Sequence, residues 1–172
     1  MGDLRRGPSD RRTAVLEGDP GAAGKGARAR VAHRVLIAEP DAALGAMYRS
    51  ALESDGWAVE LVSDGRTALN LAEAWRPGVL LLSTVPDLPA VTVLRRLRNS
   101  ESTRDLAVIV LTNFGDDADV QVWRDLGALG RLIKSRGVRD RLSETIDGLL
   151  DRRFSKRDRR VPTRPGRQPA ES

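Results

Sequence analysis

The 172-residue sequence contains no cysteine and a single histidine, and aromatic residues make up only 3% of it. Without cysteine, the chain has no disulfide framework, no thiolate metal site and no thiol nucleophile. No apolar run approaches the roughly 20 residues that a membrane-spanning helix needs, and the N-terminus lacks the apolar segment of a secretory signal. We therefore expect a soluble, cytoplasmic protein that has no contact with a membrane.

Positive charge is concentrated at the two ends of the chain. Residues 1–32 hold seven Arg and Lys against four Asp and Glu, and residues 151–172 hold eight against three. Residues 33–150 hold 14 against 17. Neither end shows a sustained hydrophobic period, which is typical of disorder. We predict one folded domain at 33–150 between disordered basic tails at 1–32 and 151–172.

The middle of the chain alternates short apolar runs with stretches of helical periodicity. Apolar residues that recur every three or four positions predict a helix after each run. Five strands that alternate with five helices on short connections predict an α/β fold, namely a (βα)5 doubly wound parallel sheet with strand order 2-1-3-4-5. The expected strands are 34–38, 57–62, 79–82, 106–111 and 131–134.

The fourth of these helices has an acidic start. Asp116 and Asp117 fit its first turn, where negative charge meets the positive end of the helix dipole. Its expected inward residues are Asp119, Val122, Trp123 and Leu126.

The run Val79–Leu82 is the centre of this pattern. It is continuously apolar and lies between Pro77 and Pro86, which is typical of a strand buried on both faces of a parallel sheet. Ligands of open α/β sheets bind beyond the carboxyl ends of such strands. Ser83 and Thr84, which follow the run, are therefore placed where a functional site is expected.

Taken together, these segments resemble the receiver domain of two-component response regulators, over the whole of the predicted domain. Arg34–Asp41 resembles the family's first strand and its acidic end, and Arg76–Ser83 resembles the third strand. Val108–Thr112 is similar to the fourth strand with its switch hydroxyl, and Leu132–Lys134 to the approach to the family's lysine. The resemblance implies a flavodoxin-like, receiver-like fold and a role in a bacterial two-component phosphorelay.

The phosphoacceptor position departs from the family pattern. Members of the family phosphorylate an aspartate at the end of the third strand, beside a divalent metal ion such as Mg²⁺. Ser83 occupies that position here if the loop to Pro86 is one residue shorter than usual, whereas a shifted gap places Leu82 there. Neither alignment supplies an aspartate, and the next acidic residue along the chain is Asp87.

The residues that would hold the metal ion and the phosphoryl group are only partly kept. Glu39 matches the family's first acid, Pro40 falls on the usual metal ligand, and Asp41 lies one step on. Glu39 and Asp41 are either remnants of a metal pocket or solvated carboxylates, and in the second case Asp41 would cap a helix. Thr112 and Lys134 match the phosphate-binding hydroxyl and ammonium, and Lys134 is also a candidate ion-pair partner of Glu39 or Asp41. We expect no cofactor, although these acids leave a bound Mg²⁺ ion as an alternative.

We therefore predict a degenerate receiver, or pseudo-receiver, that acts by protein–protein interaction and is not an enzyme. The expected partner is a histidine kinase or a downstream output protein. The resemblance implies a partner surface, also open to homodimer formation, on the fourth helix, fifth strand and fifth helix. Its expected outer contacts are Trp123, Arg131, Arg136 and Arg139.

Two alternatives remain. In the first, Asp41 or Asp87 has taken over as a displaced phosphoacceptor. In the second, the arginine-rich tails bind nucleic acid or an acidic partner, because clustered positive charge attracts polyelectrolytes. The tails lack aromatic residues interleaved for stacking on bases, and their Asp and Pro residues are also typical of solvated, flexible segments.

Overall fold

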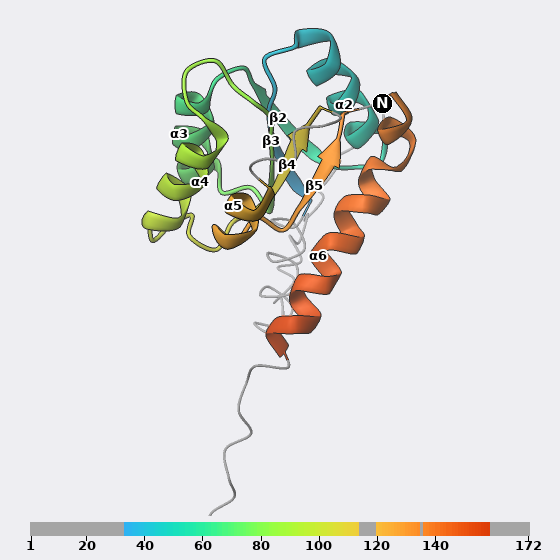
Figure 1. Ribbon diagram of the computed structural model, residues 1–172. Coiled ribbons are helices and arrows are strands. Elements are labelled where there is room, and N and C mark those ends of the chain that lie inside the picture. Colours follow the sequence, from blue (N-terminus) through green and yellow to red (C-terminus); the bar gives the residue numbers. More distant parts are fainter. Residues whose placement is uncertain (1–32, 114–119, 135, 159–172) are drawn as a thin grey trace, which may run out of the picture.

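The computed structural model describes residues 33–113, 120–134 and 136–158. The predicted tail at 1–32 and residues 159–172 of the predicted tail at 151–172 lie outside this part of the chain, and so do Asp116, Asp117 and Asp119. Figure 1 shows a central sheet between two groups of helices, with the last helix extending past the body of the domain. In the part described, no helix is long and apolar enough to cross a membrane.

Five parallel strands form one sheet in the order β2-β1-β3-β4-β5, which confirms the predicted topology. The strands are β1 (Arg34–Ala38), β2 (Ala58–Val62), β3 (Val79–Leu82), β4 (Ala107–Thr112) and β5 (Gly130–Ile133). The helices are α2 (Ala42–Ser54), α3 (Gly65–Trp75), α4 (Ala90–Asn99), α5 (Val120–Asp125), the 3-10 segment η1 (Arg136–Arg141) and α6 (Leu142–Asp158). Each connection crosses over through a helix, as parallel neighbours require.

The central strand β3 is fully buried, as its unbroken apolar sequence predicts. Successive side chains of a strand point to opposite faces of the sheet, so β3 contributes to two cores. Leu80 and Leu82 pack in the core that α3, α4 and α5 cover. Val79 and Leu81 pack in the core that α2 and α6 cover. Burial of a Leu or Val side chain stabilises a fold by about 1.5–3 kcal/mol, so this strand holds both layers in place.

Acidic residues at strand ends set where two helices begin. The Asp41 carboxylate accepts hydrogen bonds from the backbone N–H groups of Ala43 and Leu44, both at 3.0 Å, and caps α2. Asp64 accepts from the Thr67 N–H at 2.8 Å and caps α3. The predicted cap role of Asp41 is confirmed.

The last helix corrects the predicted domain boundary. We expected a disordered tail from residue 151, but α6 continues to Asp158. Leu150 is its last buried apolar residue, and Phe154 is 57% exposed. The residues after Leu150 are mostly Arg, Lys and Asp, and a helix that is already nucleated propagates through such residues without an apolar face. The hydrophobic pattern therefore marked the end of the core and not the end of the helix.

Candidate functional site at the carboxyl ends of the strands

Four polar residues predicted for the site lie where four strands end. Glu39 follows β1, Ser83 follows β3, Thr112 is the last residue of β4, and Lys134 follows β5. The ladders continue through them, because the Ser83 N–H donates to the Ala38 carbonyl at 2.9 Å and the Lys134 N–H donates to the Thr112 carbonyl at 2.7 Å. The parallel register thus brings residues from distant parts of the sequence to one edge of the sheet.

Glu39 and Lys134 form an ion pair at the centre of this edge. Lys134 Nζ lies 2.8 Å from Glu39 Oε2, and the two side chains are 15% and 1% exposed. Glu39 Oε1 accepts the Asp41 N–H at 3.0 Å. A carboxylate this deeply buried is tolerated only with a charged partner and hydrogen bonds, and here it has both. Of the two acids predicted as partners of Lys134, the structure therefore selects Glu39.

The two hydroxyl groups of the site are sealed from solvent. Ser83 is 0% exposed and Thr112 is 3% exposed. Within the described part of the chain, neither Ser83 Oγ nor Thr112 Oγ1 has a hydrogen-bond partner. A buried hydroxyl without an adjacent base is a poor nucleophile.

Tyr48 is a further polar residue near this site, and the sequence analysis did not single it out. It lies on α2 and is fully buried. Burial raises the pKa of its hydroxyl, and the negative charge of Glu39 raises that pKa further. The ring therefore stays neutral beside the ion pair. Nothing in its sequence context distinguishes it from a core residue, since its spacing along α2 is that of the apolar face.

The acids considered as displaced phosphoacceptors both bind helix N-termini. Asp41 caps α2, and Asp87 accepts the N–H groups of Gly65 at 2.7 Å and Arg66 at 3.0 Å, at the start of α3. The hydrogen bond from Gly65, more than any other contact, lowers the pKa of Asp87. The role of Asp87 was missed because its partners lie 22 and 21 residues away in the sequence.

Within the described residues, the two carboxylates at this edge already have partners in the chain. Mg²⁺ prefers near-octahedral coordination by oxygen. Glu39 Oε2 is taken by Lys134, Pro40 has no side-chain donor atom, and Asp41 Oδ1 accepts two backbone N–H groups. In residues 33–113, 120–134 and 136–158, no group of three His, Asp or Glu side chains is placed to hold a metal ion.

The predicted outer contacts divide into two groups. Trp123 is only 8% exposed and packs in the core beneath α5, so its prediction as an outer contact is wrong. Val122, predicted to face inward, is 36% exposed. The apolar face of this short helix is centred on Trp123, whose large ring fills the space against the sheet. Arg131 and Arg139 are exposed, whereas the side chain of Arg136 lies outside the described residues.

A doubly wound five-stranded sheet with an acid, a hydroxyl and a lysine at its carboxyl edge defines a class of signalling domains. Residues 35–147 match the family model of the response regulator receiver domain. The chain belongs to this family of two-component signalling proteins, as its sequence resemblance predicted.

Curated relatives include response regulators that this chain matches over less than half of their length. The DNA-binding dual master transcriptional regulator RpaA of Synechocystis is 32% identical over 120 residues, which cover 69% of this chain and 49% of that protein. The transcriptional regulatory protein CseB of Streptomyces avermitilis is 39% identical over 95 residues, 55% of this chain and 39% of that protein. The chain thus spans less than half the length of these relatives.

Solved receiver structures share the fold. The chemotaxis response regulator CheY4 of Vibrio cholerae superimposes with a TM-score of 0.63 at 24% identity, covering 68% of this chain and 98% of CheY4. The receiver domain of the sensor histidine kinase PA1611 of Pseudomonas aeruginosa, with a magnesium ion in its active-site cleft, gives a TM-score of 0.62 at 25% identity. That match covers 69% of this chain and 97% of the PA1611 domain.

Proposed function

We propose that this chain is a pseudo-receiver, which takes part in two-component signalling through protein–protein contacts and without phosphorylation of an aspartate. The observation that carries the proposal is the residue after β3. The residue there is Ser83, which is fully buried and aligns with the family's phosphoacceptor if the loop to Pro86 is one residue shorter than usual. A serine hydroxyl cannot replace a carboxylate in forming an acyl phosphate.

The remaining acids support this interpretation. Asp41 and Asp87 each accept two hydrogen bonds from backbone N–H groups, so a phosphorylated form would give up a helix cap. Exchanging a Ser, Thr, Asn or Asp cap for Ala costs about 0.5–2 kcal/mol. Both carboxylates are therefore already used by the fold.

The ion pair offers a reason why the fold does not need the metal ion and phosphoryl group that a receiver site binds. The Lys134 ammonium in a receiver site would bind phosphoryl oxygens, but here it neutralises the buried Glu39 carboxylate. One lysine thus supplies the positive charge that the acid would otherwise require from a metal ion. In this proposal the domain holds a single conformation at its carboxyl edge, in the presence or absence of Mg²⁺.

Receiver domains interact with histidine kinases and output domains, and we propose a partner of this kind. The proposed partner surface is made by α5, β5 and α6, where a homodimer is the alternative arrangement. Arg131 on β5 and Arg139 on η1 are exposed and would contact the partner. Trp123 is withdrawn from this set because it is buried.

The test is a labelling experiment on the full chain. The protein is incubated with acetyl phosphate and Mg²⁺, and the phosphorylated fraction is read by intact mass. We expect no acid-stable, base-labile phosphoryl group. Robust labelling of the unmodified chain would contradict the proposal. If Asp41→Asn or Asp87→Asn then abolished that label, the displaced phosphoacceptor would be the correct interpretation.

A restored site provides the positive control. The double substitution Ser83→Asp and Pro40→Asp returns a carboxylate to each of the two positions where the family carries one. Labelling of this variant beside an unlabelled natural chain would show that the fold accepts the chemistry once the acids are present. A circular dichroism spectrum and a thermal melt of the variant would establish that it is folded.

Nucleic-acid binding by the arginine-rich ends stays a second proposal, supported by their charge and by the DNA-binding relative. The experiment is removal of residues 1–32 and 159–172, which leaves α6 complete. If binding to duplex DNA and its dependence on salt concentration do not change on this removal, the tails are not responsible.

A further inference from the structure

The edge strand β5 is the strand of the sheet that packing holds least. None of its four residues is buried, whereas every residue of β3 and β4 is. Its one strand neighbour is β4. Leu132 is partly buried against the core that α2 and α6 cover. A segment with few buried apolar contacts opens more readily than the core of a fold, so β5 depends on contacts other than packing.

The ion pair between Glu39 and Lys134 joins this edge strand to the other half of the sheet. Glu39 follows β1 and Lys134 follows β5, and both β3 and β4 lie between those strands. Neighbouring strands are about 4.8 Å apart, so the backbones of β1 and β5 are separated by roughly 14 Å. Lys134 Nζ nevertheless lies 2.8 Å from Glu39 Oε2. The two side chains therefore extend toward each other across the ends of β3 and β4.

Backbone hydrogen bonds fix both ends of this connection. The Glu39 N–H donates to the Val62 carbonyl at 2.9 Å, and Glu39 Oε1 accepts the Asp41 N–H at 3.0 Å. The Lys134 N–H donates to the Thr112 carbonyl at 2.7 Å. Among the described residues, Glu39 Oε2 has no partner other than Lys134. Movement of the end of β5 away from the sheet would therefore leave a buried carboxylate oxygen without a counter-charge.

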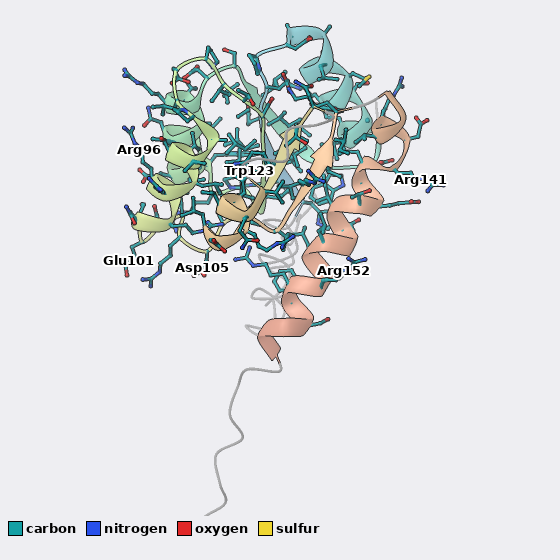
Figure 2. All side chains as sticks on the ribbon, in the orientation of Figure 1. Arg96, Glu101, Asp105, Trp123, Arg141 and Arg152 are labelled. Atoms are coloured by element: carbon teal, nitrogen blue, oxygen red, sulfur yellow. The ribbon has the colours of Figure 1, made fainter. Side chains whose placement is uncertain are left out.

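We propose that the Glu39–Lys134 pair is a latch that keeps the end of β5 closed against the sheet. The inference rests on the proposed function, because β5 forms part of the proposed partner surface. Arg131 is exposed on this strand, three residues before Lys134. After Lys134 the chain continues into η1 and α6, whose exposed side carries Arg141 and Arg152 (Figure 2). The latch at the carboxyl edge thus sets the position of the strand from which the partner surface is built.

A latch of this kind regulates binding through a coupling free energy. A partner that binds the closed surface is favoured while the pair is intact, and a partner that needs β5 displaced has to break the pair. Closure of the latch and binding of the partner therefore change each other's equilibrium by the same factor. The effect of the latch is local. Without the two charges β5 opens by itself, whereas with them it opens only together with a large part of the fold.

The test is hydrogen–deuterium exchange of the full chain, followed by mass spectrometry of its peptides. The test variant is Glu39→Gln with Lys134→Met, which breaks the latch and leaves no unpaired charge in the buried site. One peptide covers β5 at residues 129–134, and the reference peptide covers β3 at residues 79–82. The comparison of the two peptides separates local opening of β5 from a change in overall stability.

The matched control is Arg49→Met with Glu53→Gln. It removes an ion pair of the same length, 2.8 Å, whose side chains on α2 are 46% and 45% exposed. Both variants remove one positive and one negative charge, so the net charge of the chain is unchanged. A thermal melt establishes that each variant is folded.

We expect exchange of the β5 peptide to accelerate at least about tenfold in the test variant, while exchange of the β3 peptide changes by less than about threefold. The control should leave both peptides unchanged. An equal acceleration of the two peptides would overturn the proposal, because the pair would then contribute only to overall stability. Unchanged exchange of the β5 peptide would overturn it too, because the ladder to β4 would then hold the strand alone.

The exchange experiment and the labelling experiment can fail separately. Labelling with acetyl phosphate reports whether the chain carries a phosphoacceptor, and hydrogen exchange reports what holds β5 on the sheet. A labelled natural chain would contradict the pseudo-receiver assignment and leave the exchange result standing. A β5 peptide that exchanges equally in the natural chain and the test variant would remove the latch and leave that assignment unaffected.

Discussion

The two edges of this parallel sheet handle charge in opposite ways. At the carboxyl edge, one buried carboxylate meets one ammonium at 2.8 Å, and the flanking hydroxyls of Ser83 and Thr112 are sealed. At the amino edge, five arginines are among the described residues that line a pocket. Ligands of such folds ordinarily bind at the carboxyl edge. Here an ion pair within the chain occupies part of that edge.

The contrast follows from burial. Two opposite charges in a poorly solvated site attract each other strongly, but each has lost its hydration. If one of them is removed, the other stays buried without a compensating charge. Exposed guanidinium groups keep their hydration and repel one another only modestly, so a cluster is tolerated. We therefore expect the removal of one charge to lower the stability of the fold greatly at the carboxyl edge and little at the amino edge.

The largest expected effect comes from Lys134→Met. The substitution leaves Glu39 buried without a counter-ion, and breaking a buried pair in this way costs about 3–5 kcal/mol. Because Lys134 is 15% exposed, we expect a loss at the lower end, about 3 kcal/mol, in the free energy of unfolding measured with urea at pH 7.

Two further variants sharpen this test. Arg49→Met breaks an ion pair of the same length, 2.8 Å, whose side chains are 46% and 45% exposed, and we expect a much smaller loss. The double variant Glu39→Gln with Lys134→Met removes both charges and should recover much of the stability. If Lys134→Met and Arg49→Met destabilised the protein equally, burial would not be what separates the two edges.

The second prediction concerns the turn between α5 and β5. Gly127→Ala places a Cβ on a residue with φ of +74°, which costs about 1–2 kcal/mol of stability. The control is Gly148→Ala on α6, where an added Cβ meets no atom within 4 Å and the better helix former should stabilise by up to about 1 kcal/mol. Thermal melts distinguish the two, and equal shifts would mean that the turn tolerates the strain.

The fold was predictable from sequence because its signals are local. The run Val79–Leu82 needed two apolar faces whatever surrounded it, and Asp41 caps the helix that begins beside it. The sequence also offered Glu39 or Asp41 as the partner of Lys134, since parallel strands place their carboxyl ends together, and the structure selects Glu39. In each of these cases the periodicity of one or two segments contained the information.

The remaining features depend on contacts between distant segments. Asp87 binds the start of α3 from a different loop, and Trp123 fills a space whose shape depends on the sheet beneath it. The pocket at the amino edge is lined by residues from Arg98 to Arg153, and Arg153 lies on a part of α6 that the sequence analysis assigned to a tail. Such sites leave no periodic trace in a single sequence.

The third prediction is a pH dependence at Asp87. Hydrogen bonds lower its pKa in the folded state below the usual value of about 4. The carboxylate therefore stabilises the fold above about pH 4, and this contribution is lost as the pH falls through the lowered pKa. Asp87→Asn removes one of the two acceptors of the α3 cap and cannot titrate. We expect a lower melting temperature than that of the natural chain at pH 7 and a difference that shrinks toward pH 2; a difference that grows in acid would contradict this account.

The smallest expected effect tests whether the carboxyl edge is closed. Thr112→Val exchanges a buried hydroxyl that has no partner for a methyl group of similar size, so stability should change by less than about 0.5 kcal/mol or rise slightly. Thr103 is the matched control, since it is equally buried but donates to the Leu97 carbonyl at 2.9 Å, and Thr103→Val should cost about 1 kcal/mol. A loss at Thr112 as large as that at Thr103 would mean that its hydroxyl has a partner in solution. The site would then be open to water at the position where a receiver binds its phosphoryl group.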